Sequence, residues 1–110
     1  MSKTMSSLRL CVFVPEDALE EFIAAVSPHI PAFLGGYDHV CWWSEKGVEQ
    51  SRKLPDGEIK RVPCRKFECS LPGEEAIVSD FIEKIIRPNH PWEEPVITLS
   101  HQSIAIPPQT

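Results

Sequence analysis

The sequence of 110 residues has the length of one small domain, and its 42% hydrophobic and 25% charged residues are close to the globular average. We expect a single domain over residues 1–110, with flexible ends at 1–7 and 107–110. The net charge of −5 argues against a general nucleic-acid binder, which would need clustered Lys and Arg. No apolar run is long enough to span a membrane, and the first residues lack the apolar segment of a secretory signal. We therefore expect a cytoplasmic protein with no membrane partner.

The first part of the chain reads as strand, helix and strand. Residues 8–14 (LRLCVFV) are apolar at nearly every position and are closed by Pro15, which is typical of a strand buried on both faces. Residues 16–30 place apolar side chains at helical spacing. Paired glycines at 35–36 mark a turn, and residues 37–43 supply the aromatic and β-branched side chains of a second strand.

A hairpin follows, with a projecting arm at 45–60. The turn signal at 54–57 leads into a third strand within 58–71, where Pro63 confines the early part to a sheet edge or a bulge.

The hairpin is basic, because residues 45–66 contain seven basic and four acidic side chains and so carry +3, while the rest of the chain carries −8. The basic residues of the arm are Lys46, Arg52, Lys53, Lys60 and Arg61. The segment is interpreted either as a solvated hairpin or as a surface that attracts an acidic protein or a small anionic ligand.

The last part of the chain repeats the helix and strand pattern. Residues 73–86 carry a second amphipathic helix that Pro88 stops, and residues 95–100 form a fourth strand, with a short edge piece at 104–106. The order βαββαβ predicts the ferredoxin-like α+β fold, a four-stranded antiparallel sheet with two helices on one face. The other face is then open unless a second subunit covers it, which suggests a homo-oligomer.

Three stretches carry a resemblance to a known family: GGYDHVCWWSEKG at 35–47, KFECSLP at 66–72 and HPWEEP at 90–95. They resemble the insertion domain of the YqfO-like proteins, relatives of the NGG-one-interacting factor (the Nif-three family). The resemblance covers about residues 8–104, and HPWEEP is its most specific element.

This resemblance implies a domain similar to the PII signal proteins and the CutA proteins, which assemble as trimers through sheet edges and open faces. The larger family members also have an enzyme-like body with a two-metal centre, which has no counterpart in these residues. Its metal ligands and hydrolase activity are therefore not transferred to this chain. The hairpin is shorter than in the family and lacks most of its glycines.

The stretch at 89–97 (NHPWEEPVI) follows the second helix and has two interpretations. In the structural one, the prolines hold His90 and Glu94 in extended conformations, and the stretch is a stiff connector with Trp92 packed over the helix end. We favour this interpretation.

In the functional interpretation, His90 with Glu93 or Glu94, joined by His39, binds a divalent metal or a polar small molecule. Neighbouring strand residues point to opposite faces, so only one of Asp38 and His39 could take part.

The aromatic residues Tyr37, Trp42, Trp43 and Trp92 are structural or interface candidates. Trp42 and Trp43 should point to opposite faces of a strand, one into the core and the other onto the open face. On the open face, a subunit contact is favoured over a ligand platform.

No catalytic motif is recognised, so we name no catalytic residue, and an enzyme is the less favoured class. The leading hypothesis is a non-catalytic homo-oligomer, with a trimer favoured over a dimer. It binds a small ligand or a divalent metal, or docks a protein partner with its hairpin. The alternative is a small metal-dependent hydrolase that uses His39, His90, Glu93 and Glu94.

Overall fold

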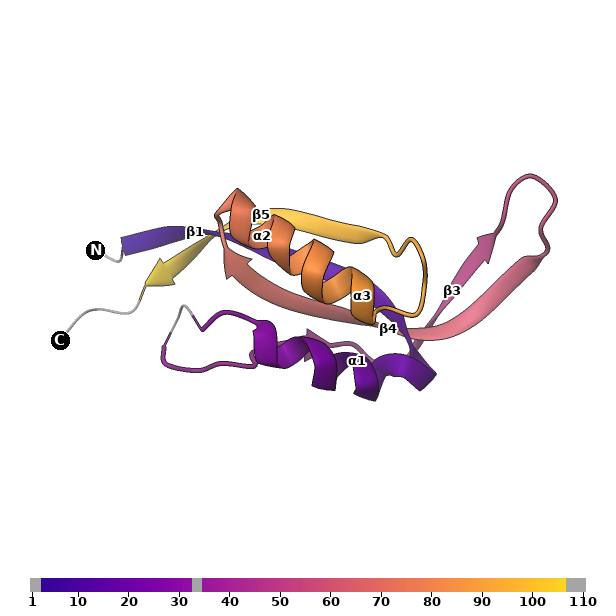
Figure 1. Ribbon diagram of the computed structural model, residues 1–110, viewed down its shortest axis with the longest axis horizontal. Helices are drawn as coiled ribbons and strands as arrows, with labels where there is room; N and C mark the ends of the chain where they lie inside the picture. Colours follow the sequence, from indigo (N-terminus) through magenta and orange to yellow (C-terminus); the bar gives the residue numbers. More distant parts are fainter. Residues whose placement is uncertain (1–2, 33–34, 107–110) are drawn as a thin grey trace.

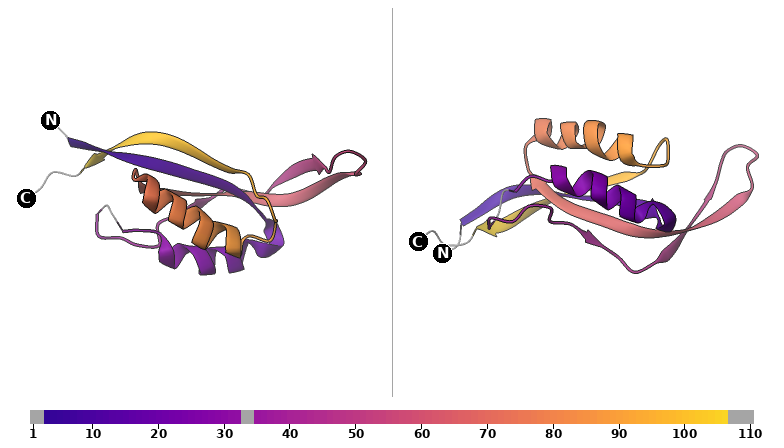
Figure 2. Two further views of the ribbon diagram at one scale, coloured as in Figure 1. Left: turned by 45° about the horizontal axis from the view of Figure 1, so that its top comes forward. Right: turned by 60° about the horizontal axis from the view of Figure 1, so that its bottom comes forward.

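The computed structural model describes residues 3–32 and 35–106, which form an antiparallel sheet with helices on one of its faces (Figures 1 and 2). The strands are β1 (Lys3–Pro15), β2 (Trp42–Trp43), β3 (Gly47–Arg52), β4 (Ile59–Pro72) and β5 (Ile97–Ile106). They are ordered β2-β4-β1-β5, and β3 pairs with β4 off this path. This is the predicted ferredoxin-like α+β fold, with a fifth strand, β3, in the segment predicted as the projecting arm.

The side chains of β1 alternate between a covered and an open sheet face. Leu10, Val12 and Val14 are completely buried beneath the helices, whereas Cys11 is half-buried and Phe13 is 41% exposed. The expectation that this strand is buried on both faces is therefore wrong for the single chain, because the helices cover only one face.

Both terminal strands are longer than predicted. Lys3–Ser7, expected in a flexible end, belong to β1 and pair with Gln102–Ile106. The fourth strand and the edge piece at 104–106 are therefore one continuous strand, β5. The two segments order each other through backbone hydrogen bonds, which neither segment could form alone.

The second predicted strand is mostly irregular. Only Trp42–Trp43 of residues 37–43 pair with β4. The preceding backbone is a turn in which Gly35, Gly36 and His39 have φ angles of 65°, 74° and 60°. This left-handed conformation is incompatible with a pleated strand.

The helical layer contains α1 (Leu19–Val26), α2 (Glu75–Phe81) and α3 (Arg87–Asn89). A 3₁₀ turn at Glu16–Ala18 leads into α1, a second at Ser27–His29 follows it, and a π-helical turn at Ile82–Ile86 joins α2 to α3. The helix therefore passes Pro88, where the sequence placed its end. The wide π turn precedes the proline, and Asn89 Nδ2 donates to Ile85 O at 2.8 Å to satisfy a terminal carbonyl.

The core lies between the sheet and this layer. Phe22 of α1 and Phe67 of β4 meet edge to face, with ring centroids 5.1 Å apart. Around them lie further buried apolar side chains, among them Leu10, Val12, Val14, Leu19, Val26, Leu71, Val78, Phe81 and Ile86.

The hairpin of β3 and β4 projects from the end of the molecule opposite to the chain ends (Figure 1), and the overall extents are 59 × 25 × 24 Å. Residues 59–63 of β4 lie outside the main sheet and pair with β3 alone. Pro63 lies in this two-stranded part, where one edge of β4 needs no hydrogen-bond donor. No helix in residues 3–32 and 35–106 is long and apolar enough to cross a membrane.

Candidate functional site

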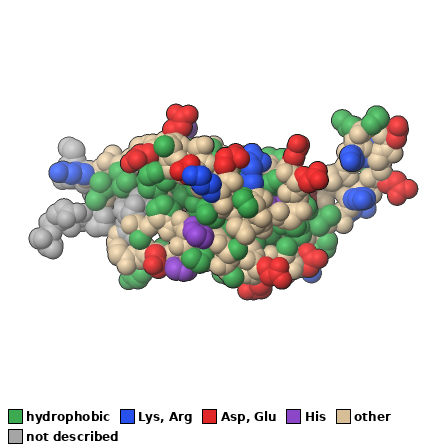
Figure 3. Space-filling view, in the orientation of Figure 1, with side chains coloured by type: hydrophobic (Ala, Val, Ile, Leu, Met, Phe, Trp, Pro, Cys, Tyr) green, Lys and Arg blue, Asp and Glu red, His purple; other side chains and the backbone are tan. Residues whose placement is uncertain are grey.

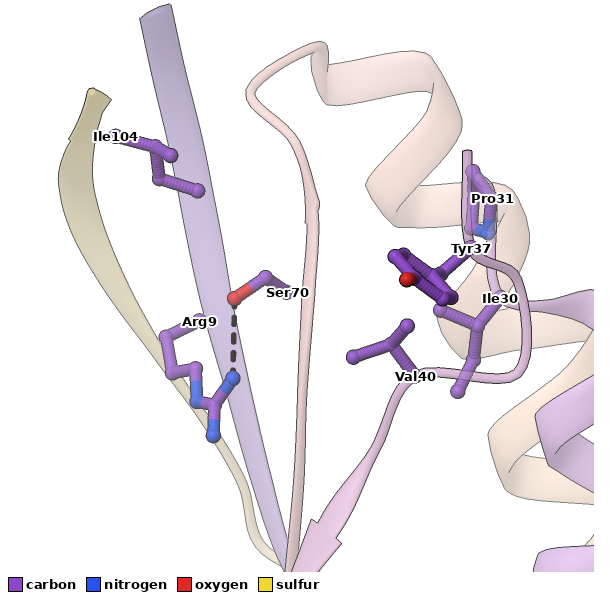
Figure 4. Close-up of a pocket in the computed structure, with 7 residues that line it drawn as sticks. All are labelled: Arg9, Ile30, Pro31, Tyr37, Val40, Ser70 and Ile104. Carbon is purple, nitrogen blue, oxygen red and sulfur yellow. Dashed lines mark hydrogen bonds between the residues drawn. The ribbon is translucent and has the colours of Figure 1, made fainter. Parts of the chain in front are cut away.

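A cleft of about 460 Å³ opens between the uncovered sheet face and the segment that follows α1 (Figure 4). Arg9, Ser70 and Ile104, from β1, β4 and β5, form one wall. The opposite wall consists of Ile30, Pro31, Tyr37 and Val40. Most of the lining is apolar and its polar groups are few, which is the usual character of a small-molecule site.

The polar part of the first wall is Arg9 and Ser70, and Arg9 also contacts side chains outside the cleft. Its Nη1 donates to Ser70 Oγ at 3.1 Å, and its Nε donates to Glu68 Oε1 at 3.3 Å. Lys66 Nζ lies 3.8 Å from the other oxygen of the same carboxylate. Two cations therefore share one carboxylate, and the three side chains together carry a charge of +1. The Arg9 and Glu68 side chains are only 30% and 20% exposed, so their charges are screened less than those at a free surface.

His90 lies at the other end of the helical layer, in the connector between α3 and β5. Its ring is buried and packs edge to face on Phe22, with centroids 5.6 Å apart. The Trp92 backbone N–H donates to His90 Nδ1 at 3.1 Å, so this nitrogen carries no proton in the assigned hydrogen-bond network. The other nitrogen, Nε2, then donates to Phe13 O at 2.8 Å. Both ring nitrogens are used by the backbone, and burial lowers the pKa of His90.

The other proposed ligands are not gathered around His90. Glu93 and Glu94 are exposed in the connector, and His39 is exposed in the turn before β2, where its Nδ1 lies 2.9 Å from Asp38 Oδ1. The expectation that only one of Asp38 and His39 could serve a common site is wrong, because these residues form a turn and not a strand. The described ranges contain no group of three or more His, Cys, Asp or Glu side chains placed to hold a metal ion.

The aromatic candidates have different environments. Tyr37 is 74% exposed and lines the cleft, and Trp92 is half-buried against His90, with ring centroids 5.1 Å apart. Trp42 and Trp43 lie opposite Glu68 and Phe67, and therefore on opposite faces, as expected. Both remain exposed, so neither indole is a core residue, because β2 is a two-residue strand at the sheet edge. The Lys66 ammonium lies 5.8 Å from the Trp42 ring centroid.

The basic residues of the arm project with the hairpin. Arg61 Nε donates to Gln50 Oε1 across the two strands at 2.9 Å. Within the part of the chain that the structure describes, Lys46, Arg52, Lys53, Lys60 and Arg61 make no ion pair. The arm also exposes apolar side chains, namely Val48, Leu54 and Ile59.

An ion pair fixes the base of the arm to the start of α1. Arg65 donates from Nε and Nη2 to the two Glu16 carboxylate oxygens, at 2.6 and 3.0 Å, and from Nη1 to Ser44 O at 3.3 Å. Hydrogen bonding from Arg65 lowers the pKa of Glu16. The direction of the arm is therefore set by a bidentate contact as well as by its strand pairing.

The four cysteines are free thiols in the structure. Burial raises the pKa of each, and that of Cys69 reaches about 12. Thiols with raised pKa values are poor nucleophiles at neutral pH.

Sequence reasoning did not identify Arg9, Ser70, Lys66 and Glu68 as site residues. One signal was available: Arg9 is the single charged residue in the apolar stretch LRLCVFV. Its partners lie 59 and 61 residues further along the chain and become neighbours only through the pairing of β1 with β4.

Comparison with known proteins gives a structural likeness. No protein-family model matches the sequence, and no curated protein matches it. Among solved structures, a Bacillus cereus protein related to NIF3 matches with a TM-score of 0.77 and 22% identity, over 94% of this chain and 28% of that one. CutA1 from Oryza sativa matches with a TM-score of 0.64 and 13% identity, over 97% of this chain and 85% of that one.

The divalent cation tolerance protein (Cut A1) from Thermus thermophilus also matches, with a TM-score of 0.61 and 15% identity, over 87% of this chain and 82% of that one. This chain thus spans just over a quarter of the NIF3-related protein but most of each CutA1 chain. At these identities the likeness concerns the fold. The chain has the ferredoxin-like fold of the CutA1 proteins and of one part of the NIF3-related protein, as the sequence resemblance predicted.

Proposed function

We propose that this chain is a non-catalytic module that forms a homo-oligomer, with a trimer favoured over a dimer, in which the β3–β4 arm of one copy docks on its neighbour. The observation that carries the proposal is the arm itself, a two-stranded ribbon that extends away from the core. An isolated two-stranded hairpin is marginally stable in water. The arm also leaves Val48, Leu54 and Ile59 exposed at 66%, 74% and 62%, so it gains stability if another surface covers it.

The distribution of charge favours the body of a second copy of the chain as the surface on which the arm docks. Arg65 and Lys66 lie outside the arm, where they pair with Glu16 and Glu68. The arm at 45–64 therefore carries +1 and the remainder of the chain carries −6, so the arm of one copy is complementary in charge to the body of the next. Exposed carboxylates surround the start of α1, at Asp17, Glu20 and Glu21, and make no ion pair within the described residues. In the space-filling view, acidic side chains lie on the body next to the arm and also on the arm itself (Figure 3).

The sheet edge formed by β5 supports the same proposal. This strand has ten residues (ITLSHQSIAI) with no charged side chain and no proline, and within residues 3–32 and 35–106 it pairs only with β1. Monomeric proteins usually protect a long edge strand with charges, prolines or bulges, because bare edges pair with other chains. The resemblance to CutA proteins, which implies trimers built through sheet edges and open faces, agrees with this arrangement.

The proposal is tested by light scattering on the purified chain at micromolar concentration. Wild type should be oligomeric, and the double variant Arg52→Glu, Lys53→Glu should dissociate. Added salt should weaken the wild-type assembly, because it screens the attraction between exposed charges.

The double variant Lys84→Glu, Arg87→Glu is the matched control, since it changes the net charge equally on the exposed side of the helical layer. It should assemble as wild type does. A monomeric wild type, or an arm variant that assembles as wild type does, would contradict the proposal.

A metal-dependent hydrolase receives no comparable support. His90 uses both ring nitrogens in backbone hydrogen bonds, and His39, Glu93 and Glu94 lie in exposed segments on either side of α2 in the sequence.

A further inference from the structure

We infer that the cleft between the open sheet face and the wall formed by Ile30, Pro31, Tyr37 and Val40 binds a small organic carboxylate with an apolar body. The inference deepens the proposed function, because it gives the module a ligand and rests on that function for its role. The binding site itself lies within one copy of the chain. The proposed assembly uses the arm and the β5 edge and assigns no role to this cleft.

The shape of the cleft suits a small molecule. Its volume of about 460 Å³ lies in the usual range of roughly 300 to 1,000 Å³ for ligand pockets. Figure 4 shows the side chains of Tyr37 and Val40 facing Arg9 and Ser70 across the opening. Val40 is 58% exposed and Tyr37 is 74% exposed in the unliganded chain, so a ligand with an apolar body would cover apolar surface on both.

The charge of Arg9 in the cleft wall selects an anionic group. A guanidinium has five N–H groups, and Arg9 uses one at Nε and one at Nη1 within the described residues. The remaining N–H groups have the planar arrangement that binds a carboxylate through two hydrogen bonds. Glu68 does not cancel this charge, because Lys66 shares its carboxylate.

The balance between charge and apolar surface favours a monocarboxylate over a phosphate ester. The cluster carries a charge of only +1, and Lys66 is directed to Glu68 and the Trp42 ring and does not line the cleft. A phosphate group carries a charge of about −2, and only one guanidinium is available to bind it. Four of the seven lining residues are Ile30, Pro31, Val40 and Ile104, which offer no partner for additional phosphate oxygens.

The site is separate from the arm along the sheet. β4 enters the arm at Cys64, which pairs with Pro15 at the end of β1. Arg9 pairs with Ser70, further back along β1 toward Lys3. A variant that disrupts the arm therefore leaves every residue of the cleft in place.

The test uses phenylacetate as the probe, with phenylacetamide as its neutral analogue and inorganic phosphate as an anion without an apolar body. Amide chemical shifts of the isotope-labelled full chain are followed during each titration. Phenylacetate should shift the amides of Val40, Ser70 and Ile104 in a saturable way. Phenylacetamide and phosphate should each bind at least about tenfold more weakly, because an ionic hydrogen bond or an apolar contact is lost.

Two pairs of variants locate the site. Arg9→Gln should weaken phenylacetate binding about tenfold or more and bring its affinity close to that of phenylacetamide, whereas Arg61→Gln on the arm removes the same charge and should have no effect. Val40→Asp places a carboxylate in the apolar wall and should abolish binding, whereas Val48→Asp on the arm should not. The Val40 pair keeps the test decisive if Arg9→Gln does not fold, since Val40 is exposed.

The arm variant Arg52→Glu, Lys53→Glu separates this inference from the proposed function. If it becomes monomeric but still binds phenylacetate, both proposals hold. If wild type is monomeric but binds phenylacetate at the cleft, only the assembly proposal fails. Binding that is unchanged in Arg9→Gln, equal affinity for phosphate, shifts confined to other residues, or the absence of saturable shifts would each overturn the carboxylate site.

Discussion

At the scale of single residues, His90 connects three parts of the fold. Its Nε2 donates to the Phe13 carbonyl of β1, its Nδ1 accepts the Trp92 N–H of the connector, and its ring packs on Phe22 of α1. A histidine beside two carboxylates in the sequence suggests a ligand, yet the buried ring is used to satisfy two backbone groups. Its neighbours Glu93 and Glu94 are exposed, and the described residues place no metal-binding group of three or more His, Cys, Asp or Glu side chains around them.

We predict that His90→Ala lowers the free energy of unfolding by about 1–3 kcal/mol, because it leaves the Phe13 carbonyl and the Trp92 N–H without their partner. The Trp92 indole is only half-buried, so Trp92→Ala should be the less costly of the two truncations. Urea unfolding of both variants measures the order. His101→Ala, at an exposed histidine, serves as the control and should stay within about 0.5 kcal/mol of wild type.

The pH dependence of stability should carry the signature of His90. Burial lowers its pKa in the folded chain, so the unfolded chain binds the proton more readily. The stability that the folded chain gains from a neutral His90 is complete above the pKa of about 6.5 for His90 in the unfolded chain. This stability is lost as the pH falls through the lower pKa of His90 in the folded chain. His90→Gln, which can still donate and accept, should remove this part of the dependence in urea titrations between pH 7 and 5. An unchanged slope would show that His90 is not its source.

At the scale of elements, the junction between β4 and α2 depends on a close backbone approach. The Gly73 N–H donates to Ser6 O at 3.1 Å, and a Cβ at Gly73 would lie 2.5 Å from Ser6 Oγ and 3.0 Å from the Ser6 carbonyl carbon. The N-terminal part of β1 therefore determines which residue can begin the turn into α2, although the two are far apart in the sequence.

We expect Gly73→Ala to destabilise the chain by about 1–3 kcal/mol, because the added methyl group overpacks a site bounded by backbone. Gly47→Ala, at the start of β3, is the matched control, because the nearest atom to a Cβ there is Cys64 O at 3.9 Å. It should be neutral within about 0.5 kcal/mol. Thermal or urea unfolding compares the two, and equal losses would show that the contact with Ser6 relaxes without cost.

At the scale of the whole molecule, the chain is a small body with one bare sheet edge, one open sheet face and one projecting arm (Figures 1 and 2). Phe13 and Trp42 on the open face remain 41% and 48% exposed. The body contains one core between the sheet and the helices, and this core does not extend into the arm. Self-association would cover these surfaces together.

Charges placed on the β5 edge should therefore prevent assembly. Thr98 and Gln102 are exposed on this strand, and Thr98→Lys, Gln102→Lys introduces the charges that monomeric proteins use to protect an edge. Light scattering should show a shift toward monomer. Ala24→Lys, on the exposed side of α1, should leave the oligomer intact, and an intact oligomer in the edge variant would show that β5 takes no part in it.

The sequence by itself determined the fold class and the order of its elements. Leu19, Phe22 and Val26 recur at helical spacing, so they form one apolar face of a helix, which must be buried. The proline, glycine and charge patterns of the hairpin mark its position in the chain. These signals are local, because each depends on side chains within a few residues of one another. The sequence also separated the basic arm from the acidic remainder, since charge is a property of composition.

The tertiary structure alone decided the candidate site. Arg9, Ser70 and Ile104 share a wall because β1 pairs with both β4 and β5, and this register is not encoded by any short stretch. The role of His90 also depended on the distant Phe13 carbonyl, 77 residues away in the sequence. The irregular segment at 37–41 could not be distinguished from a strand, because its residues have strand propensity, whereas the left-handed backbone at Gly35, Gly36 and His39 prevents a pleated strand. Long-range pairing and burial, and not residue type, thus determined which polar side chains face a cleft and which satisfy the backbone.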